Sequence, residues 1–241
     1  MIKFENFEVV GLDHAIRGMR NPKNSWDKID SHVVNSVLVE EEVCPGVTTL
    51  VYKACDPYIS VGKNDYDLMT RLRNAGTDHR KFMRMITVYV DITAPLYWWK
   101  EFDTYKVGTV ANSCSTMHTI HKKEFTLDDF SHGFLTDDID NCLTWGLEVF
   151  EDNLVLELII AKLNQNREKF IVTKDMRYWH SMIQLLPTSY NQKRTVMMNY
   201  EVLANIYKSR KNHKLHEWRS LCNWASELPY SELITGTEDK S

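Results

Sequence analysis

Two pairs of histidines have the residue type and spacing that could bind a metal ion. His118 and His121, and likewise His213 and His216, are three positions apart, so each pair would share one face of a helix. A zinc site needs three or four ligands, and no cysteine or carboxylate completes either pair at a recognised spacing. We therefore predict no metal site and interpret these histidines as solvated side chains.

The cysteines offer little chemistry of their own. The five of them are scattered, their number is odd and none forms a CxxC pair. This usage argues against a disulfide framework and for a reducing compartment. Taken alone, Cys114 is better interpreted as a small buried residue than as a nucleophile.

Composition and charge narrow the class of partner. The chain has 241 residues, 43% of them hydrophobic and 26% charged, which is the balance of an ordinary globular protein. A net charge of −4 gives no global attraction to nucleic acid or anionic lipid, so any bound phosphate must meet a local cluster of cations. The start of the chain resembles no signal peptide, and its longest apolar run is too short to span a bilayer. We expect a cytoplasmic protein that acts on small molecules or on another protein, without a membrane or nucleic-acid partner.

The predicted helices and strands, which must position any site, indicate an α+β fold with a small mixed or antiparallel sheet and long helices. Residues 85–92 alternate apolar and polar side chains, which predicts a strand with one buried face. Pro95 suits the first turn of a helix predicted over residues 96–106. Acidic residues at 137–140 favour the first turn of a long helix that reaches about Asn164.

Further elements flank this central part. Asn199 can cap a helix that ends at Arg210, after a strand over residues 195–198. Asn64 can cap a helix that Gly76 ends. The other predictions are strand-like runs at 33–39 and 48–51, a surface loop at 20–27, and a last helix at 215–225. We expect one domain over residues 1–234 and a flexible tail over 235–241.

One block of the chain resembles a known family. From His79 it reads HRKFMRMITVYVDITAPLYWWKEFDTYKVGTVANSCSTMH, which is similar to the central block of the flavin-dependent thymidylate synthases. In that family a Gly-His pair precedes a strand, Ala-Pro begins a helix, and an Arg-His-Arg signature follows. Aligned without a gap, Ala94 and Pro95 meet the helix start, and residues 104–106 meet the signature.

The spaced polar residues after the signature can be matched in two registers. Without a gap, Thr109 meets the family's first serine and Cys114 its second. A slip of one residue instead places Asn112 on the family's asparagine and Ser115 on its second serine. Both registers stay open.

A second block supports the resemblance. The segment LLPTSYNQKRTVMMNYEVLANIYKSRKNHKLHEW resembles the family's C-terminal part, in which Leu-Pro precedes a strand and a helix capped by asparagine. Counted from Pro187, Asn199, Asn205 and Arg210 fall where the family has Asn, Asn or His, and Arg. The two blocks follow one another in the family's order.

The resemblance implies the family's fold, a homotetramer with flavin sites at subunit boundaries, and FAD as the cofactor. Trp98 and Trp99 point to different faces of their helix, so we expect one of them at a subunit interface. No catalytic side chain is assigned, because the family's reaction does not rely on a cysteine nucleophile. The implied flavin-binding residues are His79, Lys106, Thr109, Asn199 and Asn205; the implied substrate-binding residues are Glu101, Asn112, Cys114, Ser115 and Arg210.

The departures from the family concern phosphate binding. The signature's first arginine is Thr104 and its histidine is Tyr105, which leaves Lys106 as its cation. The arginine ahead of Leu-Pro is Ile183, and an arginine of the last helix that contacts flavin is Glu201. Arginine grips a phosphate with a two-pronged fork, whereas lysine acts as a point charge. Deoxyuridylate should therefore bind more weakly unless other cations substitute, for which the candidates are Arg84, Lys100, Lys106 and Arg210.

Two classes of function follow. The first is FAD-dependent methylation of a pyrimidine deoxynucleotide, dUMP to dTMP, with methylenetetrahydrofolate and NADPH as co-substrates; a variant is the same chemistry on another pyrimidine nucleotide. The second is an inactive or altered homologue that binds a nucleotide or a partner in a regulatory role. Thr104, Tyr105 and Ile183 favour the altered forms, and the asparagines and arginine of the C-terminal block favour the enzyme.

Overall fold

The computed structural model describes residues 2–44, 47–136 and 151–236 of the chain. Within this described part the chain forms two compact units. We call Met1–Phe7, Tyr89–Met197 and Lys214–Ser220 the first unit, and Glu8–Val88, Met198–His213 and Leu221–Ser241 the second unit. The single domain expected over residues 1–234 stays a prediction. No described helix is both long and apolar enough to cross a membrane.

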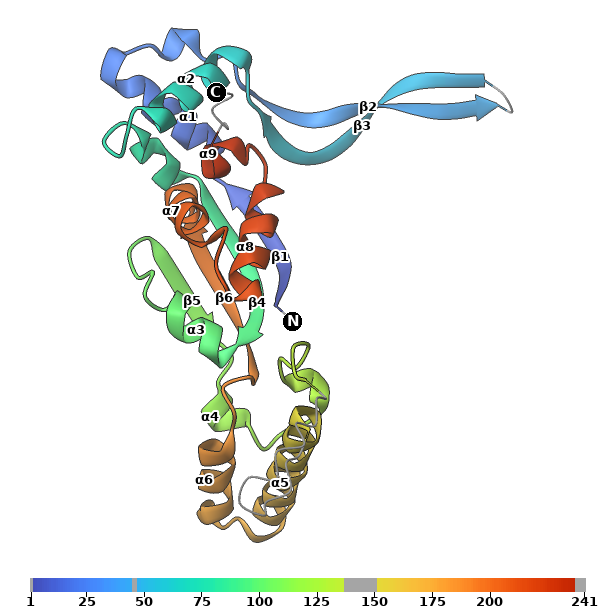
Figure 1. Cartoon of the computed structure of the whole chain (residues 1–241). Coiled ribbons are helices and arrows are strands. Elements are labelled where there is room, and N and C mark those ends of the chain that lie inside the picture. The colour runs from blue at the N-terminus through green and yellow to red at the C-terminus, as the bar shows by residue number, and fades with distance from the viewer. Residues whose placement is uncertain (1, 45–46, 137–150, 237–241) are drawn as a thin grey trace. The chain divides into compact units, whose positions relative to one another are not determined.

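A four-stranded sheet joins segments that are far apart in the sequence. Its strand order is β1-β4-β6-β5 (Figure 1). The strands are β1 (Lys3–Val10), β4 (Thr87–Pro95), β5 (Thr109–Ser113) and β6 (Asn191–Asn199). The two central strands are the ones predicted over residues 85–92, from the alternating pattern, and over residues 195–198; β6 begins four residues earlier than predicted. Val88, Val90 and Ile92 on β4 are buried, as predicted, although residues 85 and 86 precede the strand.

A pair of helices builds a separate hydrophobic core in the first unit. Helix α5 (Asp152–Thr173) packs on α6 (Met176–Leu185) (Figure 1). The predicted end at Asn164 is wrong: no helix-breaking residue follows it, and α5 continues until Lys174 takes a left-handed conformation with φ 57°. The predicted start at 137–140 lies outside the described residues. The buried core members are Ile120, Phe125, Phe130, Leu156, Leu163 and Met182.

Aromatic rings bury helix α3 (Leu96–Phe102), which follows Pro95 as predicted but ends four residues before the predicted Lys106. Trp98 lies 5.0 Å from the rings of both Phe102 and Trp218. Trp99 donates its indole N–H to the backbone oxygen of Gln192 at 2.9 Å. Trp98 and Trp99 are 0% and 1% exposed. The expectation that one of them faces another subunit is therefore wrong, because helix α8 (His216–Ser226) covers one and strand β6 the other.

The second unit contains most of the remaining helices and a long hairpin. Its helical elements are α1 (Leu12–Arg20), η1 (Asn21–Lys23), η2 (Trp26–Lys28), α2 (Lys63–Asn74), η3 (Arg80–Met85), α7 (Tyr200–Arg210) and α9 (Glu232–Thr235). Gly11 permits a close turn before α1: its φ is 87°, and an added Cβ would lie 2.2 Å from the Met85 oxygen. The predicted stop at Gly76 and the helix capped by Asn199 are confirmed.

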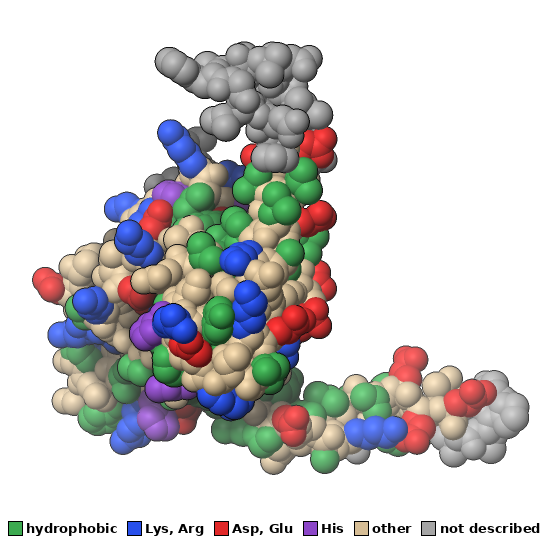
Figure 2. Space-filling model, turned by 90° about the horizontal axis from the view of Figure 1, so that it is seen from below, with side chains coloured by type: hydrophobic (Ala, Val, Ile, Leu, Met, Phe, Trp, Pro, Cys, Tyr) green, Lys and Arg blue, Asp and Glu red, His purple; other side chains and the backbone are tan. Residues whose placement is uncertain are grey.

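The hairpin extends both strand-like runs of the N-terminal part. Strand β2 (His32–Cys44) pairs antiparallel with β3 (Val47–Ser60), and the register jumps between Val34 and Ser36. Pro57 lies opposite this irregularity, where a residue without an N–H is tolerated. The hairpin projects away from α1 and α2 of the same unit (Figure 1). Hydrophobic and charged side chains both remain exposed along it (Figure 2), among them Val33, Leu38, Leu50 and Tyr58.

A buried carboxylate connects helices α1 and α2. Asp65 is 0% exposed and accepts two hydrogen bonds from the guanidinium of Arg20, at 2.9 and 2.7 Å. It also accepts the backbone N–H groups of Asp30 and Ser31, each at 3.0 Å. Arg20, assigned to a surface loop from the sequence, is therefore a buried partner of this carboxylate.

The start of α2 differs from the predicted Asn64 cap. The helix begins at Lys63, and the carboxylate of Asp30 accepts the N–H groups of Asn64 and Asp65 at 2.9 and 3.0 Å. These bonds, that of Asn64 foremost, lower the pKa of Asp30. A side chain from the preceding loop thus caps the helix in place of its own second residue.

Replacing Asp65 with asparagine should destabilise the protein by about 3–5 kcal/mol, because it leaves Arg20 buried beside a neutral group. Urea denaturation measures this loss. Asp67→Asn is the matched control: Asp67 is exposed on the same helix, and its change should stay within about 0.5 kcal/mol. Equal stabilities of the two variants would contradict the assigned role of Asp65.

Candidate functional site

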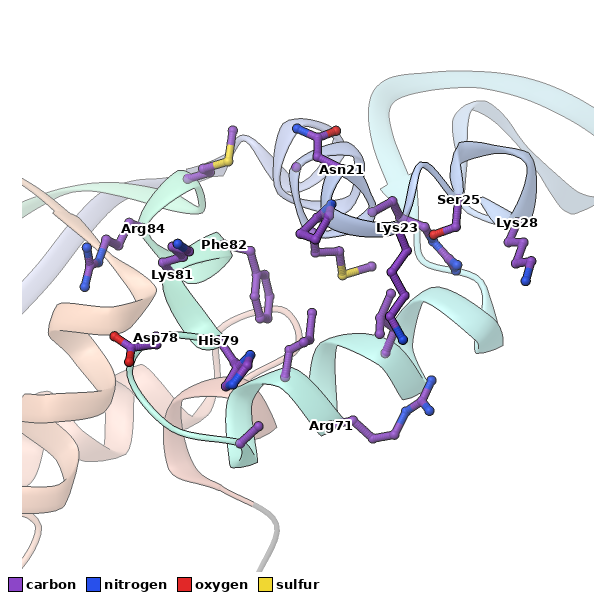
Figure 3. Close-up of a pocket in the computed structure, with 18 residues that line it drawn as sticks. Asn21, Lys23, Ser25, Lys28, Arg71, Asp78, His79, Lys81, Phe82 and Arg84 are labelled. Atoms are coloured by element: carbon purple, nitrogen blue, oxygen red, sulfur yellow. The ribbon is translucent and has the colours of Figure 1, made fainter.

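The second unit contains a cavity of about 1350 Å³ whose lining is rich in cations. It lies between α1 with the η1–η2 segment on one side and α2 with η3 on the other (Figure 3). Besides the paired Arg20, the described lining includes five Lys or Arg side chains and one acid, Asp78; the five cations are Lys23, Lys28, Arg71, Lys81 and Arg84. A chain with net charge −4 thus concentrates positive charge here.

The cavity combines these charges with an apolar floor. Figure 3 shows Lys81 and Arg84 towards one end, Lys23 and Lys28 towards the other, and Phe82 between them. Phe82 and Met19 are buried, and Leu68 and Leu72 also line the cavity. An apolar surface with charged groups at its ends suits a ligand that has both a flat ring system and anionic groups.

A network of two arginines and one glutamate holds Arg84 at this cavity. Glu201, buried on α7, accepts hydrogen bonds from the guanidinium groups of both Arg84 and Arg80. Arg80 also donates to the side-chain oxygen of Asn205 at 2.9 Å. The hydrogen bond with Glu201 raises the pKa of Arg84. Two cations and one anion leave a charge of +1, so Glu201 orients positive charge rather than cancelling it.

Of the three predicted flavin residues in the second unit, His79, Asn199 and Asn205, one belongs to the described cavity lining. His79 is exposed, precedes η3 and lines the cavity. Asn199 accepts the N–H of Val202 at 3.0 Å and so caps α7. Neither Asn199 nor Asn205 belongs to the described lining of the cavity. Their contact with a flavin stays a prediction.

Arg210, the predicted substrate residue of this unit, lies in the last turn of α7. Its Nη1 is 2.8 Å from Nε2 of His213. It does not belong to the described lining of the cavity either. Its contact with a nucleotide stays a prediction.

The first unit brings part of the predicted site together beside the signature. A pocket of about 410 Å³ is lined by Phe102, Asp103, Tyr105, Lys106, Thr109, Ala111 and Arg194. Lys106 and Thr109, both predicted as cofactor contacts, thus share one pocket. The hydroxyl of Thr109 donates to the backbone oxygen of Tyr105, which closes the turn between the helix and β5.

Arg194 is the cation that the sequence alone did not single out. It lies on β6, its Nη1 is 2.6 Å from Asp103 Oδ1, and its guanidinium carbon lies 4.2 Å from the centre of the Trp99 ring. The available signal was its place in the second family-like block, directly before the predicted strand at 195–198. The sequence of that block does not show which strand lies next to the signature segment in the fold.

The other predicted substrate residues are exposed or already hydrogen-bonded. Glu101 accepts the indole N–H of Trp218 at 2.9 Å. Asn112 and Cys114 are exposed, and Ser115 accepts the N–H of His118 at the start of α4 (Thr116–Thr119). The interpretation of Cys114 as a buried residue is therefore wrong, because it directly follows the edge strand β5. The choice between the two registers of this segment stays open.

Ile183, at the place of a family arginine, packs against the core that contains Met182. That position therefore supplies an apolar contact within the α5–α6 pair. It contributes no charge to a phosphate site.

The histidine pairs have other contacts. No group of three or more His, Cys, Asp or Glu side chains within the described residues is placed to hold a metal ion. The ring of His121 packs edge-on against Phe170, with 5.0 Å between centroids. His216 Nδ1 lies 3.1 Å from the hydroxyl of Ser220. The interpretation of these histidines as solvated is therefore wrong for His121, His213 and His216, which are partly buried, whereas His118 is exposed.

Comparison with known proteins adds a likeness in fold. No family model and no curated protein matches the chain, but solved structures do. Thymidylate synthase X from Helicobacter pylori, crystallised with FAD and dUMP, is 16% identical with a TM-score of 0.59, and the match covers 97% of this chain and 95% of that one. The UMP/dUMP methylase PolB from Streptomyces cacaoi, bound with 5-Br dUMP, is 13% identical with a TM-score of 0.57, covering 98% and 95%.

At such low identity these structural matches show a likeness of fold alone, over nearly the whole length of the chain. The chain has the predicted α+β arrangement with a small sheet and long helices, and the matched structures share its fold, as the two sequence blocks predicted. This chain has the fold of the flavin-dependent thymidylate synthases.

Proposed function

We propose that the chain is a flavin-dependent methylase that converts dUMP to dTMP, with methylenetetrahydrofolate as the carbon donor and NADPH as the reductant. One observation carries the proposal: within this fold, a cavity lined by cations includes His79, where the family resemblance places a flavin contact. Thymidylate synthase X from Helicobacter pylori was crystallised with FAD and dUMP, and both ligands are proposed here for this chain.

The cavity fits FAD in size and in chemistry. Its volume exceeds the roughly 300–1,000 Å³ of typical small-ligand sites, as a dinucleotide requires. Lys81 and Arg84 would neutralise the two anionic phosphates, because an uncompensated phosphate in a cleft is costly. Phe82 and Leu72 would contact the apolar rings. Bound FAD would supply the redox chemistry, while the protein contributes binding and orientation.

The protein's own groups would act by positioning. Glu201 holds Arg84 at the cavity, so the guanidinium is oriented before a ligand arrives. Such preorganisation reduces the conformational entropy lost on binding. Lys106 and Thr109 line a separate pocket in the first unit, where they would contact a ligand bound there.

A homotetramer in the cytoplasm belongs to the same proposal. The exposed side chains of the β2–β3 hairpin, such as Leu38 and Leu50, support association. An isolated two-stranded hairpin is at best marginally stable in water. Contact with another subunit would stabilise it.

The alternative is a homologue that binds a nucleotide without methylating it. Ile183 favours this alternative, because its side chain packs in a hydrophobic core at a position where the family has a phosphate-binding arginine. Thr104 and Tyr105 favour it as well, since neither side chain supplies the charge of the arginine and histidine they replace.

FAD should raise the Tm of the wild-type protein, because a ligand that binds only the native state stabilises it. Lys81→Gln should weaken FAD binding roughly tenfold in a fluorescence titration, the loss of one charge-assisted hydrogen bond. Lys208→Gln is the matched control: Lys208 is exposed on α7 and outside the described cavity lining. A wild-type protein whose Tm does not change at saturating FAD would exclude the flavoenzyme.

Tritium release from C5-labelled dUMP separates the two functions. With FAD, methylenetetrahydrofolate and NADPH present, we expect release that depends on all three, because substitution at C5 expels the labelled hydrogen. FAD binding without any release of tritium would refute the methylase and leave the nucleotide-binding homologue.

A further inference from the structure

Two cationic side chains line the pocket beside the signature segment (residues 104–106). Arg194 comes from β6, and Lys106 follows helix α3. Neither Thr104 nor Tyr105 supplies the family's positive charge here. We propose that this pocket binds a phosphate monoester, and that Arg194 and Lys106 hold the phosphate of the nucleotide substrate. The inference rests on the proposed nucleotide-handling function and names the phosphate site.

The guanidinium of Arg194 is held in place before any ligand binds. Its central carbon lies over the Trp99 ring, and its Nε donates to the side-chain oxygen of Gln192 at 3.0 Å. Trp99 in turn donates to the backbone oxygen of the same Gln192 at 2.9 Å. The Arg194 side chain is 15% exposed. A stacked, hydrogen-bonded arginine loses little further freedom when it grips an anion.

The site already holds an anion. Asp103 places its Oδ1 2.6 Å from Nη1 of Arg194, and its side chain is 52% exposed. Carboxylate and phosphate accept the same forked pair of N–H groups. A phosphate monoester carries about 1.5–2 negative charges, more than a carboxylate, and an exposed aspartate can turn into solvent. Phosphate would therefore replace Asp103 on Arg194 and gain the charge of Lys106.

The size of the pocket selects the class of ligand. About 410 Å³ lies near the lower end of the roughly 300–1,000 Å³ found for small-ligand sites. This volume suits a mononucleotide, or its phosphate end, rather than a dinucleotide. The larger cavity of the second unit is the one that suits FAD.

Isothermal titration of dUMP into the FAD-loaded protein tests the inference. Arg194→Gln should weaken dUMP binding about 10- to 100-fold, the range for lost hydrogen bonds to a charged group. Asp103→Asn should strengthen it about 2- to 5-fold, because it removes a competing charge from an exposed pair. Inorganic phosphate should compete with dUMP in the wild type and much less in Arg194→Gln.

Lys193→Gln is the matched control. Lys193 precedes Arg194 on the same strand, and its amino group lies 3.1 Å from Glu5 and 3.4 Å from Asp91. This variant changes the net charge equally but should keep the wild-type affinity for dUMP. Arg194→Lys, which retains the charge without the fork, should fall between the wild type and Arg194→Gln.

A measurement of FAD affinity separates failure of this inference from failure of the proposed function. We expect Arg194→Gln to bind FAD as the wild type does, which also demonstrates an intact fold. Equal dUMP affinities of Arg194→Gln and Lys193→Gln would overturn the phosphate site while leaving the flavoprotein in place. A wild type that binds FAD but neither dUMP nor phosphate would overturn it as well. Failure of the wild type to bind FAD would refute the proposed function.

Discussion

The buried ion pair between Arg20 and Asp65 determines the shape of the cavity on which the proposed function depends. Asp65 belongs to α2 and Arg20 ends α1, so the pair joins the elements that form opposite walls. Backbone N–H groups of Asp30 and Ser31 satisfy the other carboxylate oxygen. A lining rich in Lys and Arg repels itself, and this fully hydrogen-bonded carboxylate opposes that repulsion by holding the walls together.

Positive charge in this chain occupies other positions than in the family it resembles. Glu201 stands where the family has a flavin-contacting arginine, yet it holds Arg80 and Arg84 on the neighbouring η3. The signature segment keeps one cation, and Arg194 from β6 joins it in the same pocket. A bound phosphate requires positive charge at the right point in space, whichever sequence position supplies it. A degenerate signature is therefore compatible with a retained function.

The sequence predicted those strands and helix caps that depend on neighbouring residues in the chain. Alternation predicted β4, and the side chain of Asn199 accepts the N–H of Val202 as a cap should. Features that depend on distant contacts escaped prediction. Trp98 and Trp99 are both buried because α8 and β6, remote in sequence, cover them. Arg194 lines the same pocket as the signature segment because strand β6 lies beside that segment in the fold. A pattern in one sequence does not show which strand lies there.

A crystal structure of the protein with FAD tests the central claim most directly. The claim is that the cation-lined cavity of the second unit binds the flavin cofactor. It predicts electron density for the FAD pyrophosphate against Lys81 and Arg84, with His79 in contact with the same molecule. FAD bound elsewhere, with this cavity filled by solvent alone, would contradict it.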